Sequence, residues 1–358
     1  MRGGCLLRVF LAGLLLALAG VAFAGWLVFS PYRAFSDEQF VDIGKGTGSN
    51  AIAGQLASAG VIRSRAAFVL TRFLRPRARL QAGEYRFDRP ASAWTVFDRI
   101  ARGDVFYYEI TIPEGSNMFD IASAVDQLGF LSGADFLRAA RRPALIHDLA
   151  PNAPTLEGYL FPSTYRVTRN ATSDQLTRMM VGEFRRQWRA LDAAPGTDVQ
   201  RTVIMASLVE KETALPAERP EVASVYYNRL RIGMPLDCDP TTIYAALLEN
   251  RYRGTIYRSD LQNTNPYNTY AHAGLPPGPI ANPGAASLRA ALQPAQTNYL
   301  YFVRKPDNSG AHTFSATLAQ HNAAVEAYRR SQRAAAPPPP QPKPTVTRGR
   351  RSSRRRAS

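Results

Sequence analysis

The stretch RTVIMASLVEKETA, residues 201–214, has the spacing of an amphipathic helix and carries two glutamates on opposite sides. At about 100° per residue, the apolar face collects Ile204, Met205, Leu208 and Val209. Glu212 falls in the middle of this face, and Glu210 falls opposite it. A carboxyl group among apolar neighbours is costly to ionise, so its pKa rises toward the range that a general acid needs. The pattern makes Glu212 a candidate acid/base, but on its own it favours the alternative that Glu212 lies at a frayed helix end and forms an ion pair with an arginine such as Arg219 or Arg229.

From residue 151 to residue 333 the chain is helical in pattern and is interrupted by long loops. One of them, NTNPYNTYAHAGLPPGPIANPG at residues 263–284, is rich in proline, asparagine and glycine. Structureless loops of this length are usually functional or disordered, and the tyrosines, histidine and asparagines favour a binding surface. After this loop, SLRAALQPA predicts a helix, and YLYFVRK predicts a strand that can pair with HTFS at residues 312–315.

An uncharged, apolar run at residues 9–29 follows Arg2 and Arg8. About 20 apolar residues span a bilayer as a helix, and positive residues before the run place the N-terminus in the cytoplasm. The alternative is a cleaved signal peptide, because Ala-Phe-Ala at residues 22–24 resembles a cleavage site. The apolar run continues past this site, which favours a retained transmembrane anchor with a cytoplasmic segment at residues 1–8.

Two related segments follow the leader, at residues 43–62 and 112–131. The two segments are IGKGTGSNAIAGQLASAGVI and IPEGSNMFDIASAVDQLGFL. When they are aligned at one constant offset, their glycines, an Ile-Ala pair and an apolar residue coincide. Each predicts a strand, a glycine-containing turn, a short helix and a glycine stop. Between them, AGEYRF predicts a strand, and WTVFDRIARG predicts a helix that ends at Gly103. We group residues 38–150 as one small α+β module or two related ones, and we expect an α+β fold for the whole chain.

The chain has 358 residues, of which 45% are hydrophobic and 20% are charged. This length is enough for about two domains with cores of their own. The formal charge of +16 is uneven, because residues 334–358 hold seven Lys or Arg and no acidic residue. This proline- and arginine-rich tail cannot bury a core, so we expect it to be disordered. A basic balance suits anionic lipid, an acidic polymer or a solvated surface. Nucleic acid is not an expected partner, because no nucleic-acid module is present and the leader indicates export.

The two cysteines do not suggest a disulfide framework, since Cys5 precedes the leader and Cys238 lies deep in the chain. Asp237 and Asp239 flank Cys238, but further ligands at workable spacing are lacking, so we expect neither a metal nor a cofactor. A small buried thiol is the simpler interpretation of Cys238.

Several motifs occur in one order and together resemble the MltG-type, YceG-like endolytic murein transglycosylases. They are LEGYLFPSTYRV (156–167), ASLVEKETALPAERPEVASVYYNRLRIGMPLDCDPTTIYA (206–245), NPYNTY (265–270), GLPPGPIANPG (274–284), YLYFV (299–303) and HTFS (312–315). The resemblance covers most of residues 42–330. It implies a LysM-like module at 38–150 and a mostly helical, lysozyme-like catalytic domain at 151–333. It also places Glu212, followed by Thr213, at the family's catalytic acid position.

The resemblance implies a reaction that needs a single acid. Glycosidases commonly use two carboxylates, whereas a lytic transglycosylase uses the C6 hydroxyl of the substrate's own N-acetylmuramic acid and leaves a 1,6-anhydro end. The implied partners are glycan strands, peptidoglycan synthases and the inner membrane, with the catalytic part in the periplasm and the cut ending strand growth. The chain departs from the family pattern at Cys238, where threonine or serine is common, which leaves the central assignment intact.

Seven further side chains have the chemistry to bind a glycan. They are Glu157, Tyr159, Asn228, Asn268, Thr269, Tyr270 and His312. The carboxylate can orient a sugar or brace a loop, and the tyrosines can stack on sugar faces or pack in a core. The asparagines and the threonine can hydrogen-bond an acetamido group, and the histidine can line a cleft or cap a strand.

Three other functions compete with this lyase. A non-catalytic, membrane-anchored peptidoglycan-binding scaffold would not need an acid on an apolar face, so Glu212 counts against it. A hydrolase that uses water would need a second carboxylate, such as Glu157 or Glu218, and would leave a reducing end. A membrane-tethered nucleic-acid binder would owe its affinity to the arginine-rich tail.

Overall fold

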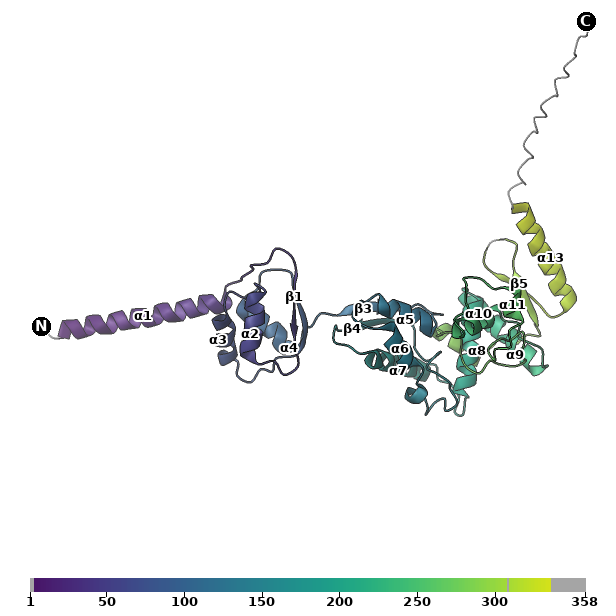
Figure 1. Ribbon diagram of the computed structural model, residues 1–358, viewed down its shortest axis with the longest axis horizontal. Helices are drawn as coiled ribbons and strands as arrows, with labels where there is room; N and C mark the ends of the chain where they lie inside the picture. The colour runs from purple at the N-terminus through teal and green to yellow at the C-terminus, as the bar shows by residue number, and fades with distance from the viewer. Residues whose placement is uncertain (1–2, 308, 336–358) are drawn as a thin grey trace, which may run out of the picture.

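A computed structural model of the chain describes residues 3–307 and 309–335. The architecture is mixed α+β with helices predominating, which confirms the predicted fold class. Figure 1 shows a long N-terminal helix, a small body, a larger body and a final helix following one another along an elongated molecule. The tail predicted at 334–358 lies outside the described residues from 336 onward.

Within the described residues, α1 (Gly3–Phe29) is the one helix long and apolar enough to cross a membrane, over Leu7–Phe29. Its side chains are mostly exposed until the last turn, where Val28 is only 1% exposed. The ring of Phe29 lies 5.4 Å from that of Trp94 in the small body. The predicted anchor is therefore one continuous helix, and its end is built into the body that follows.

The small body is a two-stranded antiparallel sheet covered by helices. It contains β1 (Gln39–Ile43), α2 (Ser49–Ser58), α3 (Arg65–Leu74), β2 (Gly83–Phe87) and α4 (Ala93–Arg102). Val41 lies opposite Tyr85 in the β1–β2 ladder, and both side chains enter the core. Gly103 ends α4 in the left-handed conformation, with φ of 71°, which glycine adopts without strain. The predicted strand AGEYRF and the helix ending at Gly103 are confirmed.

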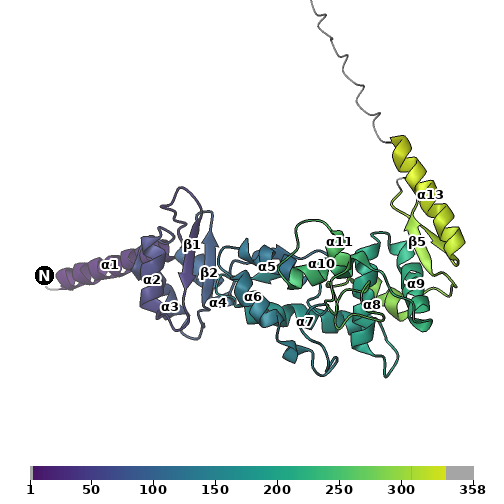
Figure 2. The ribbon, with the colours of Figure 1, turned by 45° about the vertical axis from the view of Figure 1, so that its right-hand side comes forward.

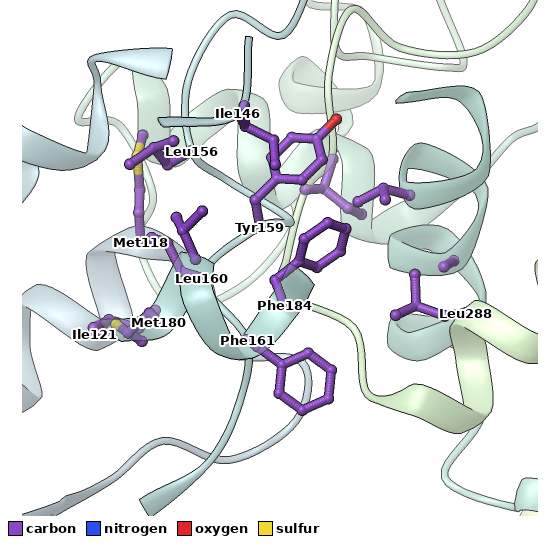
Figure 3. Packing of buried hydrophobic residues seen from close by; sticks show 14 of the residues in the cluster. Met118, Ile121, Ile146, Leu156, Tyr159, Leu160, Phe161, Met180, Phe184 and Leu288 are labelled. Carbon is purple, nitrogen blue, oxygen red and sulfur yellow. The ribbon is translucent and has the colours of Figure 1, made fainter. Parts of the chain in front are cut away.

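The larger body begins with the second of the two related segments. Its first elements are β3 (Tyr108–Thr111), α5 (Met118–Asp126), α6 (Gly133–Ala140), η1 (Pro143–Leu145), β4 (Thr164–Val167) and α7 (Ser173–Ala190). Ile121 of α5 and Met180 of α7 enter one hydrophobic cluster (Figure 3). The two cores divide near residue 105, so residues 110–150, grouped with the small module on sequence grounds, belong to the larger body. The physical reason is the antiparallel β3–β4 ladder, which ties this segment to residues beyond 150.

The rest of the larger body surrounds α8 (Val199–Glu212). The other elements are η2 (Pro216–Glu218), α9 (Arg219–Arg231), α10 (Asp239–Leu248), α11 (Arg258–Leu261), α12 (Ala285–Leu292), β5 (Tyr301–Arg304), β6 (His312–Ser315) and α13 (Leu318–Ala335). Helix α8 packs against α9, α10 and α12, and α13 lies along the β5–β6 hairpin (Figure 2). The predicted helix in SLRAALQPA is confirmed as α12, and YLYFVRK pairs with HTFS as predicted, with Tyr301 opposite Ser315. The loop at 263–284 forms neither helix nor strand.

Candidate active site

A pocket of about 500 Å³ opens at the C-terminal end of α8, and Glu212 is part of its wall. Other wall residues include Tyr226 of α9, Asp239 of α10, Tyr270 of the long loop, Tyr301 of β5, and His321 and Asn322 of α13. The pocket size is typical of small-ligand sites, and its mixture of aromatic and polar walls suits a sugar. No group of three His, Cys, Asp or Glu side chains among the described residues is arranged to hold a metal ion.

Glu212 is half-buried, and one of its carboxylate oxygens is held by two donors. Oε1 accepts a hydrogen bond from the Tyr226 hydroxyl at 2.8 Å and another from the Cys238 thiol at 3.1 Å. Oε2 accepts no hydrogen bond from the described side chains or backbone, so it is the oxygen left for a substrate. Burial raises the pKa of Glu212, even though the two donors favour the ionised form. The direction expected from the apolar helix face is therefore correct.

The arginines that could have formed ion pairs with Glu212 are engaged elsewhere. Arg219 pairs with Glu210 at 3.0 Å, and both side chains are almost fully buried. Arg229 instead lies 3.6 Å from Asp237. Because no Lys or Arg forms an ion pair with Glu212 within the described residues, the hydrogen bonds from Tyr226 and Cys238 offset only part of the cost of ionising it.

Behind the pocket, His312 is bound to Glu218. Its Nδ1 lies 2.7 Å from one carboxylate oxygen, and its backbone N–H donates to the other oxygen at 2.7 Å. Thr213 donates to the same carboxylate at 3.2 Å, so the residue after Glu212 is tied to this pair. Burial opposes ionisation of Glu218, but the hydrogen bonds from His312 outweigh it and lower the pKa. His312 is not among the pocket-lining residues, so the geometry favours the strand-supporting role over the cleft-lining one.

Glu157 is fully buried and holds three segments together. Its carboxylate accepts hydrogen bonds from the backbone N–H of Met118, the Tyr244 hydroxyl and the Asn282 amide, at 2.8, 3.0 and 2.8 Å. Burial raises the pKa of Glu157 to about 8, against the opposing effect of these donors. It is not a pocket-lining residue, so the geometry supports bracing rather than sugar orientation.

Four other predicted sugar-binding residues are also buried. Tyr159 is 0% exposed and packs edge-on against Phe184 with ring centroids 5.1 Å apart (Figure 3). Asn228 and Asn268 donate to backbone carbonyls of neighbouring loop residues. Thr269 accepts a backbone N–H at 3.0 Å. None of the four lines the pocket, and all of them stabilise the segments around it.

Tyr270 is the predicted substrate-binding residue that does line the pocket. Its side chain is 37% exposed, and its hydroxyl donates to Asp239 at 2.7 Å. The structure therefore brings together Glu212 and Tyr270 from the predicted set, with Asp239 between the loop and α10 as an additional member. From the sequence alone, Asp239 is notable only as a neighbour of Cys238 in a segment that lacks further metal ligands.

Sequence reasoning missed the two donors to Glu212 and the wall contributed by α13. Tyr226 and Cys238 lie 14 and 26 residues beyond Glu212, on α9 and at the start of α10, where no periodicity connects them to it. The buried thiol predicted at Cys238 is confirmed at 1% exposure, but its contact with the carboxylate has no signal in the sequence. His321 and Asn322 follow the last recognisable motif, so no pattern pointed to them.

The chain is similar to known proteins over most of its length. The model of the YceG-like family matches residues 41–327, which include both cores and almost the entire pocket. An endolytic murein transglycosylase from Bacillus subtilis is 33% identical over 307 residues, covering 80% of this chain and 84% of that protein. One from Streptococcus pneumoniae is 28% identical over 301 residues, covering 75% of this chain and 55% of that protein.

The fold is also similar to a solved structure. A crystal structure of a YceG-like protein from Listeria monocytogenes has a TM-score of 0.51 and 30% identity, covering 80% of this chain and 99% of that one. The family match, the relatives and the solved structure agree with one another. The chain belongs to the YceG-like family.

Proposed function

We propose that this protein is an endolytic murein transglycosylase, a lyase that cuts peptidoglycan strands between N-acetylmuramic acid and N-acetylglucosamine. The observation that carries the proposal is the half-buried carboxyl of Glu212 in the pocket wall, with a raised pKa and with both of its hydrogen-bond donors on a single oxygen. The Bacillus subtilis and Streptococcus pneumoniae relatives, both named as endolytic murein transglycosylases, support the substrate class.

In the proposed mechanism Glu212 acts first as an acid and then as a base. The protonated carboxyl transfers its proton to the glycosidic oxygen as the bond from C1 of N-acetylmuramic acid breaks. The resulting carboxylate accepts the proton of the C6 hydroxyl of the same sugar, whose oxygen bonds to C1. The products are a free 4-hydroxyl on the N-acetylglucosamine side and a 1,6-anhydro end, and no water is consumed. Hydrogen bonds from Tyr226 and Cys238 stabilise the carboxylate form between the two transfers.

The positions of the other carboxylates support lysis over hydrolysis. A retaining or inverting hydrolase needs a second carboxylate on the opposite side of the sugar. Glu157 is enclosed in the core, and Glu218 is occupied by His312 behind the pocket wall. Asp239 lines the pocket but accepts the hydroxyl of Tyr270. Asp237 also lines the pocket, 3.6 Å from Arg229, so these two aspartates are the remaining candidates for a hydrolytic base.

The proposal is tested by the chemistry of the product ends. The full chain in detergent is incubated with purified, uncrosslinked glycan strands in ¹⁸O-water, beside Glu212→Gln and Asp239→Asn, and the products are read by mass spectrometry. We expect anhydro ends without ¹⁸O from the wild type and from Asp239→Asn, and no cleavage by Glu212→Gln. Reducing ends that carry ¹⁸O would identify a hydrolase, and binding without cleavage by the wild type would identify a scaffold.

We further propose that α1 anchors the protein in the inner membrane, with a cytoplasmic N-terminus and the catalytic part in the periplasm. The uncharged run at residues 9–29, which makes up most of the span Leu7–Phe29, and Arg8 directly before that run support this orientation. An anchored endolytic enzyme would reach nascent strands beside peptidoglycan synthases and end their growth by cutting them. We also propose that the small body is a LysM-like module and that the helices around α8 form a lysozyme-like domain.

A further inference from the structure

The small body carries an apolar surface that its own folding does not explain. On α3, Val69, Phe73 and Leu74 are 40%, 79% and 54% exposed, while Phe68 packs inward against Phe97. Val69 and Phe73 are one turn apart, so they form a stripe on the outward side of the helix. Clustered exposed apolar side chains of this kind mark an interaction surface.

Arginines surround this stripe, and no acidic residue accompanies them in the sequence. Residues 43–83 contain Lys45 and six arginines and no aspartate or glutamate. The arginines are Arg63, Arg65, Arg72, Arg75, Arg77 and Arg79. Of these, only Arg75 forms an ion pair within the described residues, with Asp98 at 2.7 Å. Apolar side chains flanked by unpaired arginines are the composition of a helix that lies in a membrane interface.

The contacts between α3 and α1 indicate which surface the stripe meets. Arg63, just before α3, stacks on the ring of Trp26 near the end of α1 at 4.3 Å. Arg75, just after α3, lies 5.4 Å from the ring of Trp94, which in turn contacts Phe29 at the end of α1. Both ends of α3 are therefore connected to the point where α1 leaves the membrane, and Figure 1 shows α3 on the side of the small body from which α1 emerges.

Aromatic residues lie at the same end of α1 that contacts α3. Trp26 lies in the last two turns of α1, and Tyr32 follows it, with Arg63 stacked on both rings. Tryptophan and tyrosine concentrate at the headgroup level of bilayers. Because α3 is joined to these residues, it lies at the headgroup level whenever α1 spans the bilayer.

We propose that the outward face of α3 (Val69, Phe73 and Leu74) inserts into the headgroup region of the bilayer that α1 crosses, and that the arginines around it bind the phosphates of anionic phospholipids. This inference rests on the anchoring role of α1 given under the proposed function, and it is independent of the role of Glu212. The interfacial contact holds the small body against the membrane and so restricts the height at which the pocket meets a glycan strand.

The insertion is tested with the full chain in lipid nanodiscs that hold one protein each. An environment-sensitive fluorophore is attached at Phe73→Cys in a Cys5→Ser, Cys238→Ser background, and the same label at Ala134→Cys, an exposed position of α6, is the matched control. In discs that contain phosphatidylglycerol, we expect blue-shifted emission at position 73 and quenching by lipids with a nitroxide near the headgroup. The label at position 134 should show neither effect.

The charge requirement is tested by composition and by substitution. With the label at position 73, we expect the blue shift and the quenching to fall when phosphatidylcholine replaces phosphatidylglycerol, and also when Arg77→Gln and Arg79→Gln are combined. Water-like emission at position 73 in both lipids would overturn the proposal. Equal insertion in both lipids would overturn the anionic-lipid part. A blue shift that is absent from one-chain discs and arises only in discs loaded with two chains would identify a protein contact instead.

Failure of this inference is distinguishable from failure of the proposed function. Extraction of the chain from vesicles by alkaline carbonate would contradict anchoring by α1, on which the inference depends. Glycan cleavage by the chain without Cys substitutions reports on Glu212 alone, and Glu212→Gln should retain the blue shift at position 73. If α3 inserts into the lipid but the chain does not cut glycan, the inference about α3 holds and the proposed transglycosylase activity is refuted.

Discussion

Burial raises the pKa of both Glu157 and Glu212, yet the surroundings of the two carboxyl groups differ. Glu157 is 0% exposed and receives donors on both oxygens from Met118, Tyr244 and Asn282. Glu212 receives both of its donors on Oε1, and its side chain is part of the wall of a pocket. A raised pKa alone therefore does not identify a general acid. Access of a substrate to the carboxyl separates the catalytic group from the structural one.

The largest expected effect is on cleavage by Glu212→Gln. The amide keeps the size of the side chain but has no proton to transfer, so the turnover number should fall by about 10²- to 10⁴-fold. The rate is measured on glycan strands, with the midpoint of thermal unfolding as a control for folding. A variant that cuts at the wild-type rate would move the acid role to another group, such as Asp239.

Glu157→Gln should affect stability instead of chemistry. The amide NH₂ carries two protons where the neutral carboxyl carries one, so a neighbouring donor is left without an acceptor, and we expect a loss of about 1–3 kcal/mol in the free energy of unfolding. The folded fraction should cut glycan at close to the wild-type rate. Chemical denaturation measures the free energy of unfolding, and the turnover number corrected for the folded fraction measures the cleavage activity. An inactive but fully folded variant would contradict the bracing role.

The pH dependence of stability should follow from the same residue. The pKa of Glu157 rises to about 8 in the folded state, from about 4.5 when solvated. Between these values the folded protein holds a proton that the unfolded chain releases, so stability falls as the pH rises from about 4.5 to about 8, by at most about 1.4 kcal/mol per pH unit. Glu157→Gln should flatten this slope, as measured by denaturation at several pH values. An unchanged slope would show that other groups cause it.

A smaller effect is expected on the alkaline limb of the kcat/KM profile, which reports the loss of the proton from Glu212. Tyr226→Phe removes a hydrogen bond that favours the ionised carboxylate, so the limb should move to higher pH by about one to two units. Cys238→Ala should move it in the same direction by less, because a thiol is a weaker donor. Cys238→Ser, with a stronger donor, should move it to lower pH. If the pH of the alkaline limb is the same in all three variants as in the wild type, the limb reports the ionisation of a different group.

The smallest effect contrasts two tyrosines predicted to bind sugar. Tyr270→Ala removes an exposed ring from the pocket wall, so KM should rise by about 2- to 10-fold with little change in kcat. Tyr159→Phe removes a buried hydroxyl that has no hydrogen-bond partner, so both activity and stability should stay within a few tenths of a kcal/mol of wild type. Saturation kinetics measure KM and kcat of both variants, and thermal unfolding measures their stability. A KM effect in Tyr159→Phe would contradict its position in the core.

Local patterns in the sequence predicted those features that depend on neighbouring residues. The helix carrying Glu212, the β5–β6 hairpin, α12 and the glycine stop at Gly103 all follow from periodicity and turn chemistry within one segment. Residue type also identified polar side chains near the site. It could not tell Asn268, which is buried, from Tyr270, which lines the pocket, because burial is decided by segments distant in sequence.

The features that were missed depend on long-range contacts. Tyr226 and Cys238 meet Glu212 only because α9 and the start of α10 pack beside the end of α8. The division between the two bodies near residue 105 depends on β3 pairing with β4, whose residues Thr111 and Thr164 are 53 positions apart. No pattern within a single segment contains either contact.

The most direct test of the contrast between the two glutamates is a ¹³C NMR titration of glutamate side-chain carboxyls, with and without a soluble paramagnetic chelate. Each resonance is assigned by its absence from Glu157→Gln or Glu212→Gln. We predict that both titrate above the ordinary range, and that the chelate relaxes the Glu212 resonance while leaving that of Glu157 unaffected. A Glu212 resonance that titrates at or below about 4.3, the ordinary value for glutamate, or that the chelate does not reach, would contradict the assignment of Glu212 as an accessible general acid.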